Sequence, residues 1–175
     1  MKMRPSVVAL FSLSETVVFR NPADASQVLA ADSLSLYGSV GMTVWTNTDN
    51  QRWFVDKQGD GSLRIRSCAN LNYYLDSTGS STSTSSSCIM YTYDSGNTQR
   101  WLVEDVFSWG NNHPAPSYPE GYEPVWRFRS VSNSGCAIYF VSDQNVLRAK
   151  IATRADSLDQ LFRAAANSSG TYTFE

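Results

Sequence analysis

The sequence predicts an all-β domain made of three similar units, each with four short strands, and two repeated phrases carry this prediction. The first phrase is Gln-Arg-Trp or its remnant, at residues 51–53, 99–101 and 160–162. The second is an apolar-x-apolar-Arg phrase, at residues 17–20, 63–66 and 126–129. The interval from the Arg of the second phrase to the next Gln of the first is 31, 33 and 31 residues, so the two phrases keep a common register.

Length and composition agree with one β domain. A chain of 175 residues, 42% of them hydrophobic, is long enough to bury a core of its own. Gly, Ser, Asn, Asp and Pro separate its short apolar runs, as is typical of strands joined by turns. The net charge of −2 gives no basic surface for nucleic acid, and no apolar run approaches the roughly 20 residues of a membrane helix. We therefore expect neither a nucleic-acid partner nor membrane insertion.

Each unit offers four strand candidates in the same order. In the first unit, residues 16–60, these are 17–20, 27–31, 43–46 and 53–55. In the second, residues 61–106, they are 63–66, 73–76, 89–93 and 101–103. In the third, residues 124–175, they are 126–129, 137–142, 146–151 and 162–164. Strands this short bury their apolar faces only when the units close on one another, so we expect one domain over residues 1–175 around a shared core.

The Gln-Arg-Trp phrase has a structural explanation of its own. Trp53, Trp101 and Phe162 are expected to place large rings in the shared core. The Gln amide both donates and accepts hydrogen bonds, so it is expected to satisfy backbone groups in the turn before the strand. The phrase alone is thus evidence for a fold and not for a ligand.

Two segments between the strands are predicted to be loops. The Ser/Thr run 77–87 has too little apolar surface to pack and should be exposed. The insert 107–123 contains Trp109, Tyr118, Tyr122 and three prolines. It either packs over one end of the domain, which we favour, or binds a partner.

The cysteines and the histidine point to no metal and no cofactor. Cys68 and Cys88 could form a bridge across neighbouring strands, but three reduced and mostly buried thiols, with Cys136 as the third, are the favoured interpretation. The three lack zinc spacing, and His113 is the only histidine.

Three four-stranded units that each close on Gln-x-Trp or its remnant resemble the ricin B-type lectin family, whose fold is the β-trefoil. The likeness covers residues 16–175 and implies pseudo-threefold symmetry and carbohydrate binding, with galactose or N-acetylgalactosamine glycans at one or two shallow sites. Sugar-binding units of the family add an Asp after the second strand's apolar pair, an aromatic residue on the third strand and an Asn before the Gln. The carboxylate accepts from sugar hydroxyls, and the ring stacks on the C–H face of the pyranose.

Two units match this pattern in part, and the third is expected to be structural. In the middle unit, Thr98 replaces the Asn, and tyrosines lie on both sides of the expected aromatic position. In the first unit, Ala30 stands where the Asp belongs, and Asp32 could substitute from two residues further on. The candidate carbohydrate-binding residues are Asp76, Tyr91, Tyr93, Asn97 and Gln99 in the middle unit, and Asp32, Trp45, Asn50 and Gln51 in the first. We expect Asp76 to be exposed.

The resemblance predicts a lectin whose partners are glycans or glycoproteins, with binding strengthened by several sites or by a homodimer. The alternatives are a β-trefoil that binds proteins, such as a protease inhibitor, and a toxin-complex subunit that binds no sugar. An enzyme is not expected, because no Ser or Cys phrase indicates a nucleophile with its base. The carboxyl pairs Asp56/Asp60 and Glu104/Asp105 are interpreted as solvated loop charges.

The N-terminus only superficially resembles a secretory signal. Lys2 and Arg4 precede a short apolar stretch that Ser12, Ser14 and Glu15 interrupt, and no small-residue cleavage site follows. We expect an N-terminal strand and a cytoplasmic protein or one released by a non-classical route, with secretion through a signal peptide as the alternative.

Overall fold

The computed structural model describes residues 16–21, 24–78, 86–105, 125–143, 146–153, 160, 162–163, 165–166 and 172–173. The first unit contains β1 (Thr16–Val17), β2 (Arg20–Asn21), β3 (Asp24–Ala31), β4 (Gly38–Val44) and β5 (Trp53–Lys57). The second contains β6 (Leu63–Ser67), β7 (Tyr73–Ser77), β8 (Cys88–Thr92) and β9 (Trp101–Asp105). The third contains β10 (Val125–Ser130), β11 (Cys136–Asp143), β12 (Val146–Thr153) and β13 (Phe162–Arg163). The pair β14 (Ala165–Ala166) and β15 (Tyr172–Thr173) follows, and the short helices η2 (Asp49–Gln51) and η3 (Asn97–Gln99) precede β5 and β9.

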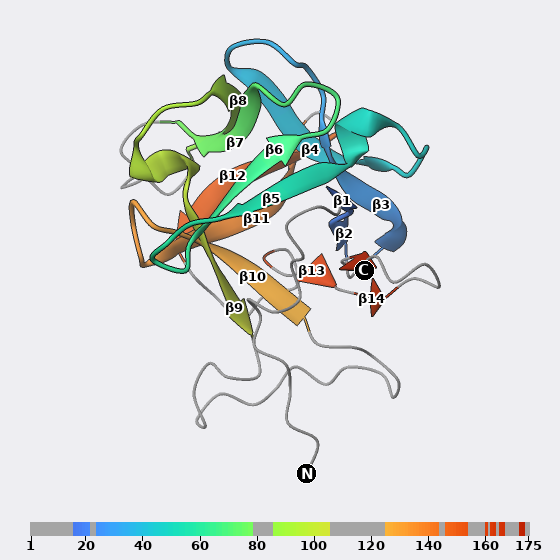
Figure 1. The fold of residues 1–175 in the computed structure, drawn as a ribbon. Helices are drawn as coiled ribbons and strands as arrows, with labels where there is room; N and C mark the ends of the chain where they lie inside the picture. The colour runs from blue at the N-terminus through green and yellow to red at the C-terminus, as the bar shows by residue number, and fades with distance from the viewer. Residues whose placement is uncertain are drawn as a thin grey trace, which may run out of the picture.

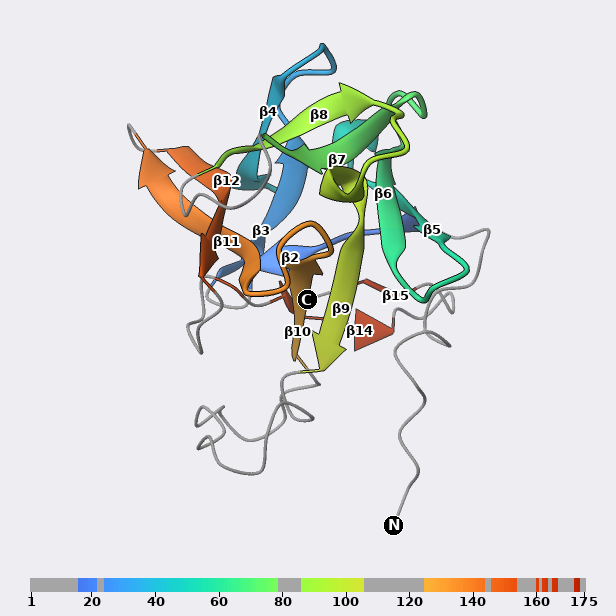
Figure 2. The same cartoon turned by 90° about the vertical axis from the view of Figure 1, so that its left-hand side faces the viewer.

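The strands form a β-trefoil, as the sequence predicts. Six strand positions close a barrel through the pairs β1–β5, β5–β6, β6–β9, β9–β10, β10–β13 and β13–β2. The hairpins β3–β4, β7–β8 and β11–β12 form a cap, in which β4 pairs with both β8 and β12. In Figures 1 and 2, β4 and β8 lie at the top of the molecule, whereas β9 and β10 extend toward the opposite side. Each of the four strands predicted in each unit has a counterpart, the first being divided at Val18 and Phe19 into β1 and β2.

Two tryptophans anchor the core, as expected. Trp53 and Trp101 are completely buried, and their indole N–H groups donate to the carbonyl oxygens of Leu29 at 3.0 Å and of Leu75 at 3.1 Å. Each indole thereby ties the last strand of its unit to the second. The side chain of Phe162 lies outside the described residues.

The glutamines make the same turn contact in all three units. Their side-chain Nε2 atoms donate to the carbonyl oxygen seven residues earlier, at Val44 (2.7 Å), Thr92 (2.7 Å) and Thr153 (2.9 Å). The Oε1 atoms of Gln51 and Gln99 accept backbone N–H groups in the same turns. The structural explanation of the repeated Gln is therefore confirmed.

All three cysteines are reduced, which confirms the favoured interpretation. Cys68 follows β6 and Cys88 begins β8, and the pairing registers place them at opposite ends of β7, out of reach of a disulfide. Cys88 and Cys136 are buried, and Cys68 is half-buried. Burial raises the pKa of the Cys68 thiol to about 11, so the thiol is protonated at neutral pH.

Several predictions from the sequence lie outside the described residues. These are the N-terminal strand before residue 16, most of the Ser/Thr run 77–87, and the insert 107–123 with His113. Within the described part of the chain, no helix is long and apolar enough to span a membrane, and no group of His, Cys, Asp and Glu side chains could hold a metal ion.

Candidate functional site

The β7–β8 hairpin of the middle unit brings two candidate residues together. Asp76 pairs with Ile89 and Tyr74 pairs with Tyr91, so Asp76 and Tyr91 are diagonal neighbours on one face of the hairpin. A hollow of about 230 Å³ opens at this face. We call it the Asp76 hollow; its polar and aromatic lining consists of Tyr37, Asp76, Ser77, Thr78, Tyr91, Asp94 and Thr98.

The Asp76 carboxylate is held by the repeated Gln. The Nε2 atom of Gln99 donates to Oδ2 of Asp76 at 2.9 Å. Asp76 is only 5% exposed, so the expectation of an exposed carboxylate is wrong. The reason is that Thr98 and Gln99, at the end of η3, cover the end of β7. Burial raises the pKa of Asp76, and hydrogen bonds from Gln99 and Thr98 oppose part of that effect.

A buried arginine that the motif does not mark as a site residue sets the orientation of Gln99. Arg64 is 4% exposed and donates from Nη1 to Oε1 of Gln99 at 3.0 Å and from Nη2 to the carbonyl oxygen of Gly96 at 3.2 Å. Because Oε1 also accepts the backbone N–H of Asp94, the amide nitrogen must face Asp76. Arg64, Gln99 and Asp76 thus form a continuous chain of hydrogen bonds from the barrel to the hollow.

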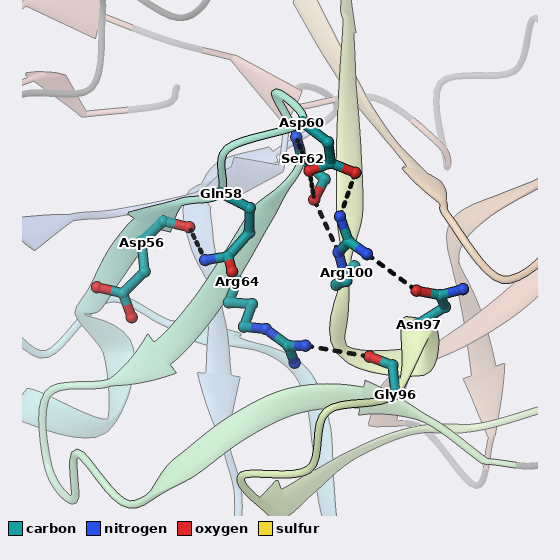
Figure 3. A network of polar contacts seen from close by, with 8 residues as sticks. All are labelled: Asp56, Gln58, Asp60, Ser62, Arg64, Gly96, Asn97 and Arg100. Atoms are coloured by element: carbon teal, nitrogen blue, oxygen red, sulfur yellow. Dashed lines mark hydrogen bonds and ion pairs between the residues drawn. The ribbon is translucent and has the colours of Figure 1, made fainter.

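The turn between β5 and β6 fixes η3 from the other side (Figure 3). Arg100 donates from Nε to Oγ of Ser62 at 3.0 Å, forms an ion pair with Asp60, and donates from Nη1 to Oδ1 of Asn97 at 3.0 Å. Hydrogen bonds from Ser62, with a further one from Arg100, lower the pKa of Asp60 to about 2. Asn97 therefore accepts a hydrogen bond from Arg100 and does not line the Asp76 hollow. Thr98 lines the hollow instead.

The interpretation of the carboxyl pairs as solvated loop charges is confirmed for Asp60, which is exposed in the turn between β5 and β6. It is wrong for Asp56, Glu104 and Asp105, which lie on the strands β5 and β9. Asp60 forms the ion pair with Arg100, and Asp56 lies on β5, where Nη2 of Arg66 donates to its Oδ1 at 2.9 Å. The two carboxylates stabilise the β5–β6 hairpin and its contact with η3.

The structure separates the two candidate tyrosines. The ring of Tyr91 lines the hollow and lies 5.2 Å from that of Tyr37, which comes from the β3–β4 turn of the first unit. Tyr93 is 60% exposed and packs instead on Tyr74, with ring centroids 5.6 Å apart, and under the Arg64 guanidinium. Of the two candidate tyrosines, only Tyr91 lines the Asp76 hollow, and Tyr93 belongs to a neighbouring stack.

Tyr37 was not predicted, because it reaches the hollow from another unit. Its backbone has a φ of 64°, and its N–H donates to the carbonyl oxygen of Met90 at 3.0 Å, which docks the turn on β8. Gly38 allows this tight turn, since a Cβ there would lie 2.0 Å from the carbonyl oxygen of Ser33.

The first unit does not assemble the corresponding carboxylate–amide pair. The side-chain amide of Gln51 is used by Val44 and by Oγ1 of Thr43, the latter at 2.9 Å. Asp32 lies beyond the end of β3, where strand alternation no longer directs its side chain. Its carboxylate accepts from Oγ of Ser39 at 3.1 Å and forms an ion pair with Arg148 of β12. Asp32 is therefore not paired with Gln51 in the way that Asp76 is paired with Gln99.

The other first-unit candidates have structural partners. Asn50 donates from Nδ2 to the carbonyl oxygen of Ala31 at 3.1 Å. Trp45 is half-buried, with the guanidinium groups of Arg20 and Arg52 at 5.5 and 6.0 Å from its ring. Ala30, at the position of the expected Asp, is completely buried.

Comparison with solved structures identifies the same fold. A designed threefold-symmetric protein, ThreeFoil, gives a TM-score of 0.67 at 19% identity, covering 83% of this chain and 94% of that one. A Polyporus squamosus lectin gives 0.67 at 15% identity, and a mosquitocidal holotoxin gives 0.67 at 17% identity. The matches cover 94% and 84% of this chain, but only 49% of the Polyporus lectin chain and 16% of the holotoxin chain.

A lectin from Macrolepiota procera, solved with lactose, matches over nearly its whole length, with a TM-score of 0.64, 13% identity, and coverage of 94% of this chain and 96% of that one. No curated protein matches the chain. The family model described as ricin-type beta-trefoil lectin domain-like matches residues 11–91 and 49–113, which together make up more than half of the chain. Membership of a lectin family supports carbohydrate binding. The chain belongs to the ricin-type β-trefoil lectin family.

Proposed function

We propose that this protein is a lectin that binds galactose- or N-acetylgalactosamine-type glycans in the Asp76 hollow. The observation that carries the proposal is the Asp76–Gln99 pair beside the ring of Tyr91. The fold neighbours from Macrolepiota procera and Polyporus squamosus were solved with lactose and with Neu5Aca2-6Galb1-4GlcNAc, both of which contain galactose. These ligands support the choice of sugar.

The lining of the hollow suits one pyranose ring. The Asp76 carboxylate has lone pairs beyond those that Gln99 and Thr98 use, so it can accept from sugar hydroxyls. Thr98 supplies a hydroxyl, and Tyr91 offers a ring face to the C–H side of the sugar. Because such a site makes few hydrogen bonds, we expect weak binding at one site and stronger binding through a homodimer or several sites.

Titration of the isotopically labelled protein with lactose tests the site by NMR. We expect the largest chemical-shift changes at Asp76, Tyr91 and Thr98, and none at Trp45. Tyr91→Ala should weaken lactose binding about threefold to tenfold, because a stacked ring contributes about 0.5 to 1.5 kcal/mol.

Tyr93→Ala is the matched control, since Tyr93 is an exposed tyrosine outside the hollow. It should leave the lactose affinity unchanged. Equal losses in the two variants would place the sugar elsewhere, and wild-type protein that binds neither lactose nor N-acetylgalactosamine would refute the proposal.

Lactose binding should weaken in mild acid. The sugar hydroxyls require the ionised Asp76, whose raised pKa means that protonation begins above the ordinary range near 3.9. The proton is taken up more readily in the folded state, so this group makes the fold more stable as pH falls through its pKa. Asp60 has a lowered pKa of about 2, so its contribution to the stability of the fold is lost only as pH falls from about 4 toward 2. Neither carboxyl group is therefore expected to unfold the protein above pH 4.

Calorimetric titrations between pH 7 and 4, paired with thermal melts, check this expectation. Affinity should fall while the protein stays folded. Affinity that stays constant down to pH 4 would show that ionised Asp76 does not bind the sugar.

A further inference from the structure

A second and larger hollow lies in the cap, where strands of all three units meet. Its volume is about 440 Å³, and Ser39 of β4, Cys88 of β8, and Arg148 and Lys150 of β12 line it. The pairings of β4 with β8 and β12, and a bridge between Ser87 and Lys150, hold these strands together, and Figure 2 shows them side by side. We call it the cap hollow.

The two hollows adjoin each other. Tyr37, Thr78 and Ile89 line both of them. A ligand longer than one sugar, held in the Asp76 hollow, can therefore continue along Tyr37 and Thr78 into the cap hollow. The site of the proposed function is thus open on the side that faces the cap.

The two hollows differ in charge. Asp76 and Asp94 line the first, whereas Arg148 and Lys150 line the second, where no carboxylate is among the described lining residues. Arg148 is already paired with Asp32. Lys150 is half-buried and forms no ion pair with any described residue. An ammonium group beside hydroxyl groups suits an anionic oxygen group, and the two carboxylates of the neighbouring hollow would repel one.

We propose that the preferred ligand of this lectin is an acidic oligosaccharide that occupies both hollows. Its neutral sugar lies against Asp76 and Tyr91, and its carboxylate- or sulfate-bearing part lies in the cap hollow and accepts hydrogen bonds from Lys150. The charge difference fixes the direction of the chain, because the reversed ligand would bring its anion to Asp76 and Asp94. This inference rests on the proposed function.

Calorimetry with matched ligands tests the inference on the whole protein. The probes are lactose, 6′-sialyllactose, the methyl ester of 6′-sialyllactose, and lactose 3′-sulfate. The ester keeps the shape of sialyllactose and removes its charge. At low ionic strength, at least one acidic probe should bind about fivefold more tightly than lactose, as one partly buried ion pair would provide. For sialyllactose, the ester should abolish the gain, and 0.5 M NaCl should reduce it for either anion.

Two variants and one matched control test whether the gain in affinity for the acidic probe comes from the cap hollow. Lys150→Gln should bring the acidic probe to the affinity of lactose while leaving lactose binding unchanged. Lys57→Gln is the matched control, because Lys57 is an exposed lysine at the end of β5 and outside both hollows. Asp32→Asn, which removes the partner of Arg148, should increase the gain for the acidic probe.

The outcomes separate this inference from the proposed function. If lactose binds and no acidic probe binds more tightly, the inference is wrong and the proposed function stands. If Lys150→Gln weakens lactose and the acidic probe equally, the inference is also wrong. If wild-type protein binds none of the probes, both fail. Thermal melts check that each variant is folded, and should Lys150→Gln not fold, the ester and salt comparisons on wild-type protein decide.

Discussion

Asp76→Asn should weaken lactose binding about 10- to 150-fold without lowering the melting temperature. This loss of affinity corresponds to about 1.5 to 3 kcal/mol, which is the net contribution of a hydrogen bond to a charged group. The amide oxygen of Asn can still accept from Gln99, so the hydrogen bond within the protein is kept. Because burial raises the pKa of Asp76, the ionised side chain disfavours folding at neutral pH, and a neutral amide removes that cost.

Calorimetric titration with lactose and a thermal melt at pH 7 measure both effects. Asp32→Asn is the matched control. The sequence predicts Asp32 as a second carbohydrate-binding carboxylate, but in the structure it contacts Ser39 and Arg148 instead. This variant should keep the wild-type affinity for lactose. Undiminished lactose binding by Asp76→Asn, or a loss of binding in Asp32→Asn alone, would move the site to another part of the molecule.

Trp101→Ala should cost about 3 to 5 kcal/mol of stability, which for a chain of this length lowers the melting temperature by about 6 to 20 °C. Trp101 is completely buried, so its removal leaves a large cavity in the core. It also leaves the carbonyl oxygen of Leu75 without the indole donor, one residue before Asp76. We therefore expect looser packing at the end of β7 in addition to the loss of stability.

Trp45→Ala makes the same chemical change at a half-buried position. Trp45 has two arginines as neighbours and no indole hydrogen bond to a described residue, so its loss should cost about 1 kcal/mol or less. Chemical denaturation of both variants gives the comparison. Similar losses for the two would contradict the assignment of Trp101 to the core of the fold.

Part of the candidate site could be predicted because it lies within one repeat. Asp76, Tyr91 and Gln99 are positioned by one hairpin and the turn that follows it, and their spacing along the chain reflects that local geometry. Arg64 could also have been found. It occupies the second position of the apolar-x-apolar-Arg phrase, where the third unit also has a buried arginine, Arg127.

Arg64 was overlooked for a physical reason. Strand alternation points it away from Leu63 and Ile65, which predicts exposure to solvent. In the fold, η3 covers that face and provides Gln99 as a hydrogen-bond partner. Alternation of apolar and polar residues shows which side chains share a face of the sheet. It does not show whether a later segment of the chain covers that face.

The threefold β architecture, its strands and its core tryptophans were predictable from the sequence alone. These features depend on contacts that recur in each unit, such as the hydrogen bond from the Gln amide to the carbonyl oxygen seven residues earlier. The residues that make such contacts therefore recur at regular intervals in the sequence. Which side chains meet at the hollows depends on how the units pack together in the folded protein. Tyr37 reaches Tyr91 from another unit, and Arg148 reaches Asp32 across 116 residues. Each of these contacts occurs once, between units, so no periodicity in the sequence records it.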